Sequence, residues 1–217
     1  GETGDNDAND NTNGDVSIET GDADVSVGVL NFVNSNFAKI GGGDDEGGSL
    51  SLWILGNGTD SDNNIDADLE SENVVTQDNY ADVYNKVDVE AETGDNDAND
   101  NTGGDVNIKT GDSDVVVAVK NMLNSNSASI DCCTKGDTEV KIADNGSDSD
   151  NDVDLDQDST NGIFQDNDAD VENKVYVDGK TGNNDANDNT NGDVSVETGD
   201  SDVSVGVLNF VNSNWAK

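Results

Sequence analysis

Pairs of aspartates follow a series of Thr-Gly dipeptides, and they are the residues whose type and spacing could do chemistry. The pairs have the form Asp-x-Asp, as in TGDNDA and TGDSDV, and Asn183 replaces the first acid in one copy. The candidate ligands are Asp5, Asp7, Asp22, Asp24, Asp95, Asp97, Asp112, Asp114, Asp185, Asp200 and Asp202. Ca²⁺ accepts several carboxylate oxygens in adaptable geometry. The pattern predicts Ca²⁺ between successive Thr-Gly-Asp turns, with Asp95, Asp97, Asp112 and Asp114 as the best examples.

The same pairs also suit a solvated acidic face of the kind found in proteins adapted to high salt, and the sequence leaves this alternative open. An EF-hand loop is a poor match. Asp148, Asp150 and Asp152 have its spacing, but Val153 stands where Gly is needed and Ser159 where the bidentate Glu belongs.

Catalysis is not expected. The chain contains no His, which removes the commonest general base and transition-metal ligand. Nearly every carboxylate has a copy 88 to 90 residues away, whereas catalysis usually needs one singular site. Cys132 and Cys133 are adjacent, and their Cα atoms, about 3.8 Å apart, are too close for an unstrained disulfide. A free or intermolecular thiol pair is therefore expected.

A 17-residue spacing organises the elements that must position these acids. Thr93 is followed by Thr110, and the same interval joins Thr3 to Thr20 and Thr181 to Thr198. A fixed short period is typical of stacked repeats, in which each unit is one coil of a solenoid. The spacing predicts that Thr93 and Thr110 lie on adjacent coils.

Apolar and polar residues alternate within these units, which indicates strands with one buried face. Buried positions are predicted at Ala81, Val83, Asn85, Val87, Val89 and Ala91, then at Ala98, Val106, Ile108, Val115, Val117, Val119 and Leu123. In the unit at 59–75 the apolar residues Ile65, Ala67 and Leu69 shift by one position, which predicts a local bulge. The fold class that follows is all-β, a β-solenoid with 17-residue coils nested in an 88–90 residue repeat.

Two columns of asparagine accompany the valines. One holds Asn31, Asn121 and Asn209; the other holds Asn34, Asn124 and Asn212. Asparagine at a repeated inward or turn position stacks its amide groups in a ladder or adopts the left-handed turn conformation. A structural role is predicted for both columns.

The longer repeat divides the chain into residues 1–92 and 93–180, with five coils each, and 181–217, with two coils. The third coil of each full repeat is longer than 17 residues, so a loop is expected there. Beside it lie the only N-x-[ST] sequons, at Asn57 and Asn145, which are candidate glycosylation sites.

The formal net charge of −40 decides which partners to expect. Nucleic acid and anionic membranes are improbable partners for such a chain, and divalent cations or high salt are an expected condition of folding. No signal peptide, hydrophobic span or lipidation motif is found, so a mature product or excised segment is expected, with no membrane insertion.

The segments TGDNDANDNTGGDV, TGDSDV, NGTDSDNN and NKVDVEAETG resemble the Asn/Thr/Gly-rich tandem repeats of surface proteins from uncultured bacteria and archaea. In general form the coils also resemble functional amyloids of the curlin type, without their glutamine-centred motif. The excess of Asp over Thr and Asn departs from the family pattern. The resemblance carries no activity to transfer, but it agrees with a cell-surface location.

The predicted function is that of an extracellular structural protein. The chain would be a subunit or segment of a filament, sheath or long adhesin, assembling end to end with copies of itself and stabilised by Ca²⁺. The alternative is a ligand-binding adhesin of tandem immunoglobulin-like β-sandwich domains, because 88 to 90 residues also suits such a unit. The 17-residue spacing weighs against that alternative.

Overall fold

The computed structural model describes residues 1–41, 49–131 and 137–217, and these ranges contain strands and turns without helices. No helix capable of crossing a membrane is therefore found in the described ranges. The strands are β1 (Glu2–Gly4), β2 (Val16–Glu19), β3 (Ala23–Gly41), β4 (Leu50–Leu55), β5 (Asp62–Gly94), β6 (Val106–Lys109), β7 (Ser113–Asp131), β8 (Thr138–Ala143), β9 (Asp150–Gly182), β10 (Val194–Glu197) and β11 (Ser201–Ala216). The predictions for Cys132 and Cys133, and for the loop at 42–48, fall outside the described residues.

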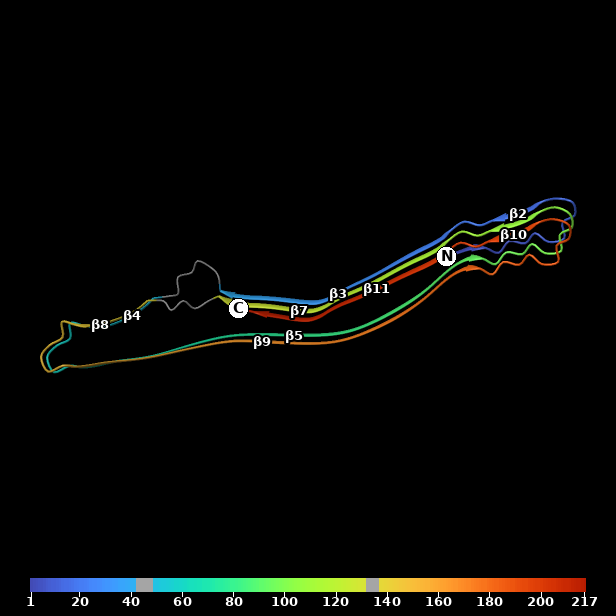
Figure 1. Ribbon diagram of the computed structural model, residues 1–217. Helices are drawn as coiled ribbons and strands as arrows, with labels where there is room; N and C mark the ends of the chain where they lie inside the picture. The colour runs from blue at the N-terminus through green and yellow to red at the C-terminus, as the bar shows by residue number, and fades with distance from the viewer. Residues whose placement is uncertain (42–48, 132–136) are drawn as a thin grey trace. The chain divides into compact units, whose positions relative to one another are not determined.

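Parallel pairing between repeats builds the sheets. The strand orders are β1-β5-β9, β10-β6-β2, β11-β7-β3 and β4-β8 (Figure 1). In the parallel pairs Thr3 lies beside Thr93, and Val106 lies between Val16 and Val194. Each repeat therefore forms one layer of the stack: layer 1 is residues 1–92, layer 2 is 93–180 and layer 3 is 181–217. The all-β solenoid prediction is confirmed.

The stacking interval differs from the prediction, because successive layers are 88 or 90 residues apart rather than 17. Thr110 does not stack on Thr93. Instead, the Thr93 hydroxyl donates a hydrogen bond to the carbonyl oxygen of Gly111 at 2.8 Å. Thr3 with Gly21 and Thr181 with Gly199 repeat the bond at the same distance. The 17-residue spacing is therefore the length of a loop whose two ends are joined by this hydrogen bond within one layer.

The tandem β-sandwich alternative is wrong as an architecture. Immunoglobulin-like sandwiches are built from antiparallel sheets within each domain. Here β2, β6 and β10 pair in parallel across three repeats, and β4 pairs in parallel with β8. A single repeat therefore supplies one strand to each of these sheets and does not form a closed domain.

The chain divides into two compact units. Unit 1 comprises Gly1–Phe32, Asp82–Met122 and Asp170–Phe210, and unit 2 comprises Val33–Ala81, Leu123–Ala169 and Val211–Lys217. One core of unit 1 contains Ala23, Val87, Val89, Ala91, Val115, Val117 and Val119. A second core contains Val16, Ile18, Ala98, Val106 and Ile108. Most of these residues were predicted to be buried from the alternation.

The predicted bulge at 59–75 is wrong. β5 runs without interruption for 33 residues, and its inward side chains stay on one parity: Ile65, Ala67, Val75 and Gln77 are all at least half-buried while their neighbours are exposed. The apparent shift of one position arose because the prediction assumed 17-residue coils, whereas β5 continues as one strand and does not turn at that interval. Leu69 and Ser71 leave the pattern, because both are exposed.

Candidate functional site: asparagine ladders, glycine columns and acidic rows

A zigzag ladder of five asparagines joins the two facing arms of unit 1. Asn31, Asn121 and Asn209 lie on β3, β7 and β11, whereas Asn85 and Asn173 lie on β5 and β9. Each side-chain Nδ2 donates to the Oδ1 of the next asparagine, in the order 31, 85, 121, 173, 209, at 2.9, 3.0, 3.2 and 3.3 Å. The two arms therefore alternate along the ladder, and every donor points to the next asparagine in the sequence. The steps from Asn85 and Asn173 cross into the later layer.

Direct bonds along each arm reinforce this ladder. Asn31 Nδ2 also donates to Asn121 Oδ1 at 2.7 Å, and Asn121 Nδ2 donates to Asn209 Oδ1 at 2.6 Å. Asn85 and Asn173 are joined in the same way at 2.7 Å. Asn121 is fully buried and makes four side-chain hydrogen bonds. An interior amide with all its bonds made fixes the register between layers, because a slip would leave buried groups unpaired.

Unit 2 contains a second ladder of the same design. Its members, in order, are Asn36, Asn79, Asn126, Asn167 and Asn214, each donating from Nδ2 to the next Oδ1 at 2.6 to 2.9 Å. Asparagines from one arm again alternate with asparagines from the other. The repetition within a separate unit shows that alternation is a property of the repeat.

The asparagine prediction is confirmed for both columns. Asn31, Asn121 and Asn209 stack as a ladder. Asn34, Asn124 and Asn212 also stack, at 3.1 Å per step, and each has a left-handed φ between 54° and 59°. The asparagines on the other arm were not predicted as partners. Asn85, the first of them, sits among buried valines at a position predicted to be inward, and that was the available signal.

Glycine columns show how closely the layers approach. A Cβ on Gly104 would lie 2.2 Å from the carbonyl oxygen of Gly14, and one on Gly192 would lie 1.9 Å from that of Gly104. The column of Gly21, Gly111 and Gly199 is similar, since a Cβ on Gly199 would lie 2.3 Å from the oxygen of Gly111. Real Cβ atoms do not tolerate such distances, so only glycine fits between layers here.

Polar side chains at the turns cap the backbone of the adjacent layer. Asp22 Oδ1 accepts from the backbone N–H of Asp112 at 2.9 Å, and Asp112 Oδ1 accepts from that of Asp200 at 2.8 Å. Asn99 N–H bonds to Asn9 Oδ1 in the same manner. Asparagine and aspartate both carry an Oδ1 acceptor, so either can satisfy an N–H that the turn would otherwise leave unpaired.

The predicted metal-site residues form rows, but along the 88–90 residue interval. Asp7, Asp97 and Asp185 pair through parallel bridges, and Asp5 stacks with Asp95 and Asn183. The second group runs through Asp22, Asp112 and Asp200 beside Asp24, Asp114 and Asp202. The expectation that Asp95 stacks directly on Asp112 is wrong, because those residues belong to one layer.

Electrostatic repulsion is concentrated at the middle of each row. Desolvation, and then the charges of Asp185 and Asp7, raise the pKa of Asp97. Desolvation, followed by the charges of Asp202 and Asp24, raises the pKa of Asp114. Like charges stacked one layer apart disfavour ionisation. In the described ranges, no three or more acidic or sulfur side chains are grouped as a ready-made metal site.

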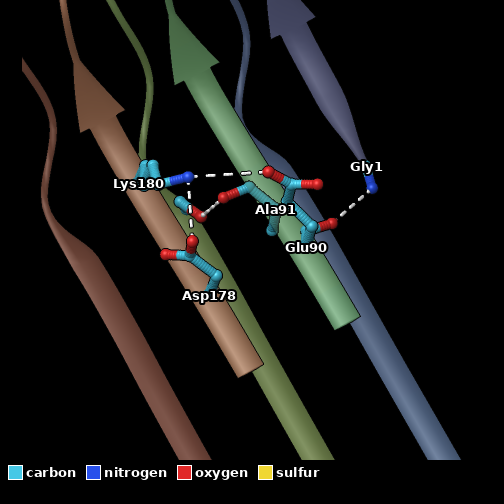
Figure 2. A network of polar contacts seen from close by, with 6 residues as sticks. Gly1, Glu90, Ala91, Asp178 and Lys180 are labelled. Atoms are coloured by element: carbon cyan, nitrogen blue, oxygen red, sulfur yellow. Dashed lines mark hydrogen bonds and ion pairs between the residues drawn. The ribbon is translucent and has the colours of Figure 1, made fainter. Parts of the chain in front are cut away.

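Lys180, near the end of β9, lies close to carboxylates of both β9 and β5. Lys180 Nζ lies 2.8 Å from Asp178 Oδ2 and 3.5 Å from Glu90 Oε1, and Figure 2 shows it between these two carboxylates. The hydrogen bond with Asp178 is the main cause of the raised pKa of Lys180. The amino group of Gly1 donates to the carbonyl oxygen of Glu90 at 2.8 Å. Lys180 is the equivalent of Glu2 and Glu92 in the two earlier copies of this segment, so a base stands here where those copies have an acid.

The two candidate glycosylation sites lie one above the other in the turns after β4 and β8. The backbone N–H of Asn57 donates to Asn145 Oδ1 at 3.0 Å. Asn145 Nδ2 donates to the carbonyl oxygen of Ile54 at 3.4 Å, and a glycan on that nitrogen would have to replace this long bond. Glycosylation of either residue stays a prediction.

Open strand edges complete the candidate site. Within the described residues β9 has one hydrogen-bonded neighbour, β5, and β8 has one, β4. On its other side β5 is paired with β1 only at Glu92–Gly94. Unpaired N–H and C=O groups along a strand are a template for another strand. The free edges of β5 and β9 can therefore pair with the strands of a further layer.

No protein-family model, curated protein or solved structure matches this chain.

Proposed function

We propose that the chain is an extracellular structural protein, a subunit or segment of a filament, sheath or long adhesin, that assembles end to end with copies of itself and is stabilised by Ca²⁺. The observation that carries the proposal is the pair of open parallel edges, one on β5 and one on β9. Both edges belong to a stack whose layers already join copies of one sequence in register. A further copy of that sequence meets the same backbone groups.

Hydrogen-bond polarity supports a single direction of growth. In both asparagine ladders each donor points to the asparagine that is later in the sequence, so the first member offers an Oδ1 acceptor and the last offers Nδ2 donors. Two copies that stack in the same orientation pair the donors of one with the acceptors of the other. A heterologous contact of this type does not close on itself and produces filaments.

The acidic rows support the role of cations. Repulsion within each row opposes stacking, and the net charge of −40 opposes association of whole chains. Ca²⁺ bound along the rows by carboxylate oxygens would relieve both. The cation would bridge carboxylates of successive layers, such as Asp7, Asp97 and Asp185, rather than occupy a preformed cage.

The remaining parts of the proposal rest on composition. We propose a cell-surface location, no catalytic role, and neither nucleic-acid binding nor membrane insertion, because the chain is uniformly acidic and lacks His. The resemblance to Asn/Thr/Gly-rich surface repeats supports the location.

Electron microscopy of the purified chain with and without excess Ca²⁺ tests assembly. Unbranched fibres that lengthen with Ca²⁺ are expected, and single particles under every condition would refute the filament. Chelation tests the cation separately. We expect the melting temperature to fall on chelation at low ionic strength, and an unchanged value would remove Ca²⁺ while leaving the filament in place.

A further inference from the structure

We propose that assembly proceeds by strand exchange: residues 1–39 of one copy displace residues 179–217 of another from the edge of β6 and β7. The inference rests on the proposed end-to-end assembly and names the surface and the partner segment. The partner is a second copy of this chain. Within one molecule, residues 179–217 then act as an internal substitute for the segment that the next copy supplies.

The two segments are chemically interchangeable on this edge. They differ at five positions only, which are Glu2/Lys180, Asp5/Asn183, Ile18/Val196, Ala23/Ser201 and Phe37/Trp215. Both already pair with layer 2 in the same register. Val106 pairs with Val16 on one side and with Val194 on the other, and β7 lies between β3 and β11.

The alternation of the asparagine ladder selects exchange over simple stacking. In unit 1 the ladder passes from one arm to the other at every step and ends at Asn209, on the arm of β3, β7 and β11. The next member must come from the arm of β5 and β9. A second copy placed on top would offer Asn31, which belongs to the same arm as Asn209, so the facing position would stay empty.

Exchange preserves the alternation. Asn31 of the incoming copy takes the place of Asn209 and accepts from Asn121 and Asn173, which now donate to Asn209 at 2.6 and 3.3 Å. Asn85 of the incoming copy then follows on the correct arm. In the same step β5 of the incoming copy covers the open edge of β9. One edge contact replaces an equivalent one, and the pairing of β5 with β9 is gained.

Glycines on the open side of layer 1 fit the same contact. Gly14 and Gly21 belong to the columns in which Gly192 and Gly199 have no room for a Cβ, yet a Cβ on Gly14 or Gly21 would meet nothing within 4 Å. Neither residue has a positive φ that would require glycine. Close approach to another layer accounts for glycine there, and in the exchanged state Gly14 would lie over Gly104 as Gly192 does now.

Charge decides when exchange occurs. Residues 1–39 are more negative than residues 179–217 by three charges, two from Glu2 against Lys180 and one from Asp5 against Asn183. In the isolated chain Lys180 lies beside Glu90 and Asp178, and exchange would place Glu2 there instead. Salt or Ca²⁺ screens that cost. Residues 179–217 of the same chain therefore occupy the edge of β6 and β7 at low ionic strength. Residues 1–39 of the incoming copy occupy it when cations are added.

Hydrogen–deuterium exchange of the full chain before and after Ca²⁺-induced assembly tests the proposal. We expect the amides of β10 and β11 to lose protection on assembly while those of β9 gain it. The peptides are separable by mass from their copies in residues 1–39, because Ser201 and Trp215 replace Ala23 and Phe37. Assembly in which β10 and β11 gain protection would overturn exchange alone. Absence of assembly would overturn both the exchange and the proposed function.

A matched pair of variants gives a second readout. Gly14→Ala has open space in the isolated chain, so its melting temperature should stay unchanged while assembly is lost. Gly192→Ala weakens the internal segment, so assembly should start at least several-fold sooner. The controls Gly28→Ala and Gly206→Ala should change neither, because their column already holds Ala118 and their Cβ atoms meet nothing within 4 Å. Slower assembly of Gly192→Ala, or normal assembly of Gly14→Ala, would contradict the exchange.

Discussion

The substitution Asn121→Ala tests whether the asparagine ladder holds the layers together. Asn121 is the middle member of the unit 1 ladder and is fully buried. It accepts from Asn31 and Asn85 at 2.7 and 3.0 Å and donates to Asn173 and Asn209 at 3.2 and 2.6 Å. The substitution removes all four hydrogen bonds and leaves a polar-lined cavity.

The expected loss of stability follows from these bonds. Each of the four partners keeps at least one further bond, since Asn31 still reaches Asn85 and Asn173 still reaches both Asn85 and Asn209. No partner is left wholly unpaired, so the loss is that of four ordinary hydrogen bonds at about 1 kcal/mol each. We expect the free energy of unfolding to fall by about 3–5 kcal/mol once the small cavity is included.

Urea unfolding followed by far-ultraviolet circular dichroism, in salt or Ca²⁺, measures this change. Asn209→Ala is the matched control, because Asn209 ends the ladder, is exposed and accepts two bonds. Its loss should be less than half as large. A loss at Asn121 below about 1 kcal/mol, or equal losses at the two positions, would refute the ladder as a source of stability.

The remaining predictions concern charge. The double substitution Glu2→Lys with Asp5→Asn gives residues 1–39 the charge of residues 179–217, so light scattering should detect assembly at lower salt or Ca²⁺ than for the unchanged chain. Raised pKa values at Asp97 and Asp114 mean that the folded chain binds protons more tightly than the unfolded chain. Their contribution to stability is complete below the ordinary value of 3.8 and is lost as the pH rises through the raised values. The urea midpoint at low ionic strength should therefore fall above pH 3.8, and Asp97→Asn should flatten that dependence; an equally steep dependence in the variant would contradict the assignment.

Period-2 alternation predicted the strands and much of the core, because one face of a strand is buried whatever its partner. Val115, Val117 and Ile108 were placed inward, and each is almost completely buried. The asparagine columns were predictable for the same reason, since an amide that recurs among buried valines needs a stacked partner. Both inferences depend only on local sequence and on the repeat.

The stacking partner was not predictable from the 17-residue spacing. The 17-residue spacing from Thr93 to Thr110 arises because the Thr93 hydroxyl bonds to the carbonyl oxygen of Gly111 and so closes a loop within one layer. A loop closed in this way has the same spacing in the sequence as one coil of a solenoid. One signal distinguished the two cases: residues 59–93 contain no glycine and no proline, so nothing turns the chain where 17-residue coils would require it. The pairing of Asn31 with Asn85 between the arms has no sequence signal beyond the inward position of Asn85.

The choice between asparagine and aspartate follows from what each position must do, and Asp112→Asn tests this. The interior members of the unit 1 ladder, Asn85, Asn121 and Asn173, both accept and donate, and every member is asparagine. Asp112 only needs to accept, from the backbone N–H of Asp200, and either residue can do so. Asn at this position keeps the bond and removes one charge from a repulsive row, so the urea midpoint at low salt should rise. Asp112→Ala also removes the charge but loses the bond, so its midpoint should lie below that of Asp112→Asn. Equal midpoints for the two variants would show that the Oδ1 acceptor contributes nothing and that charge alone acts there.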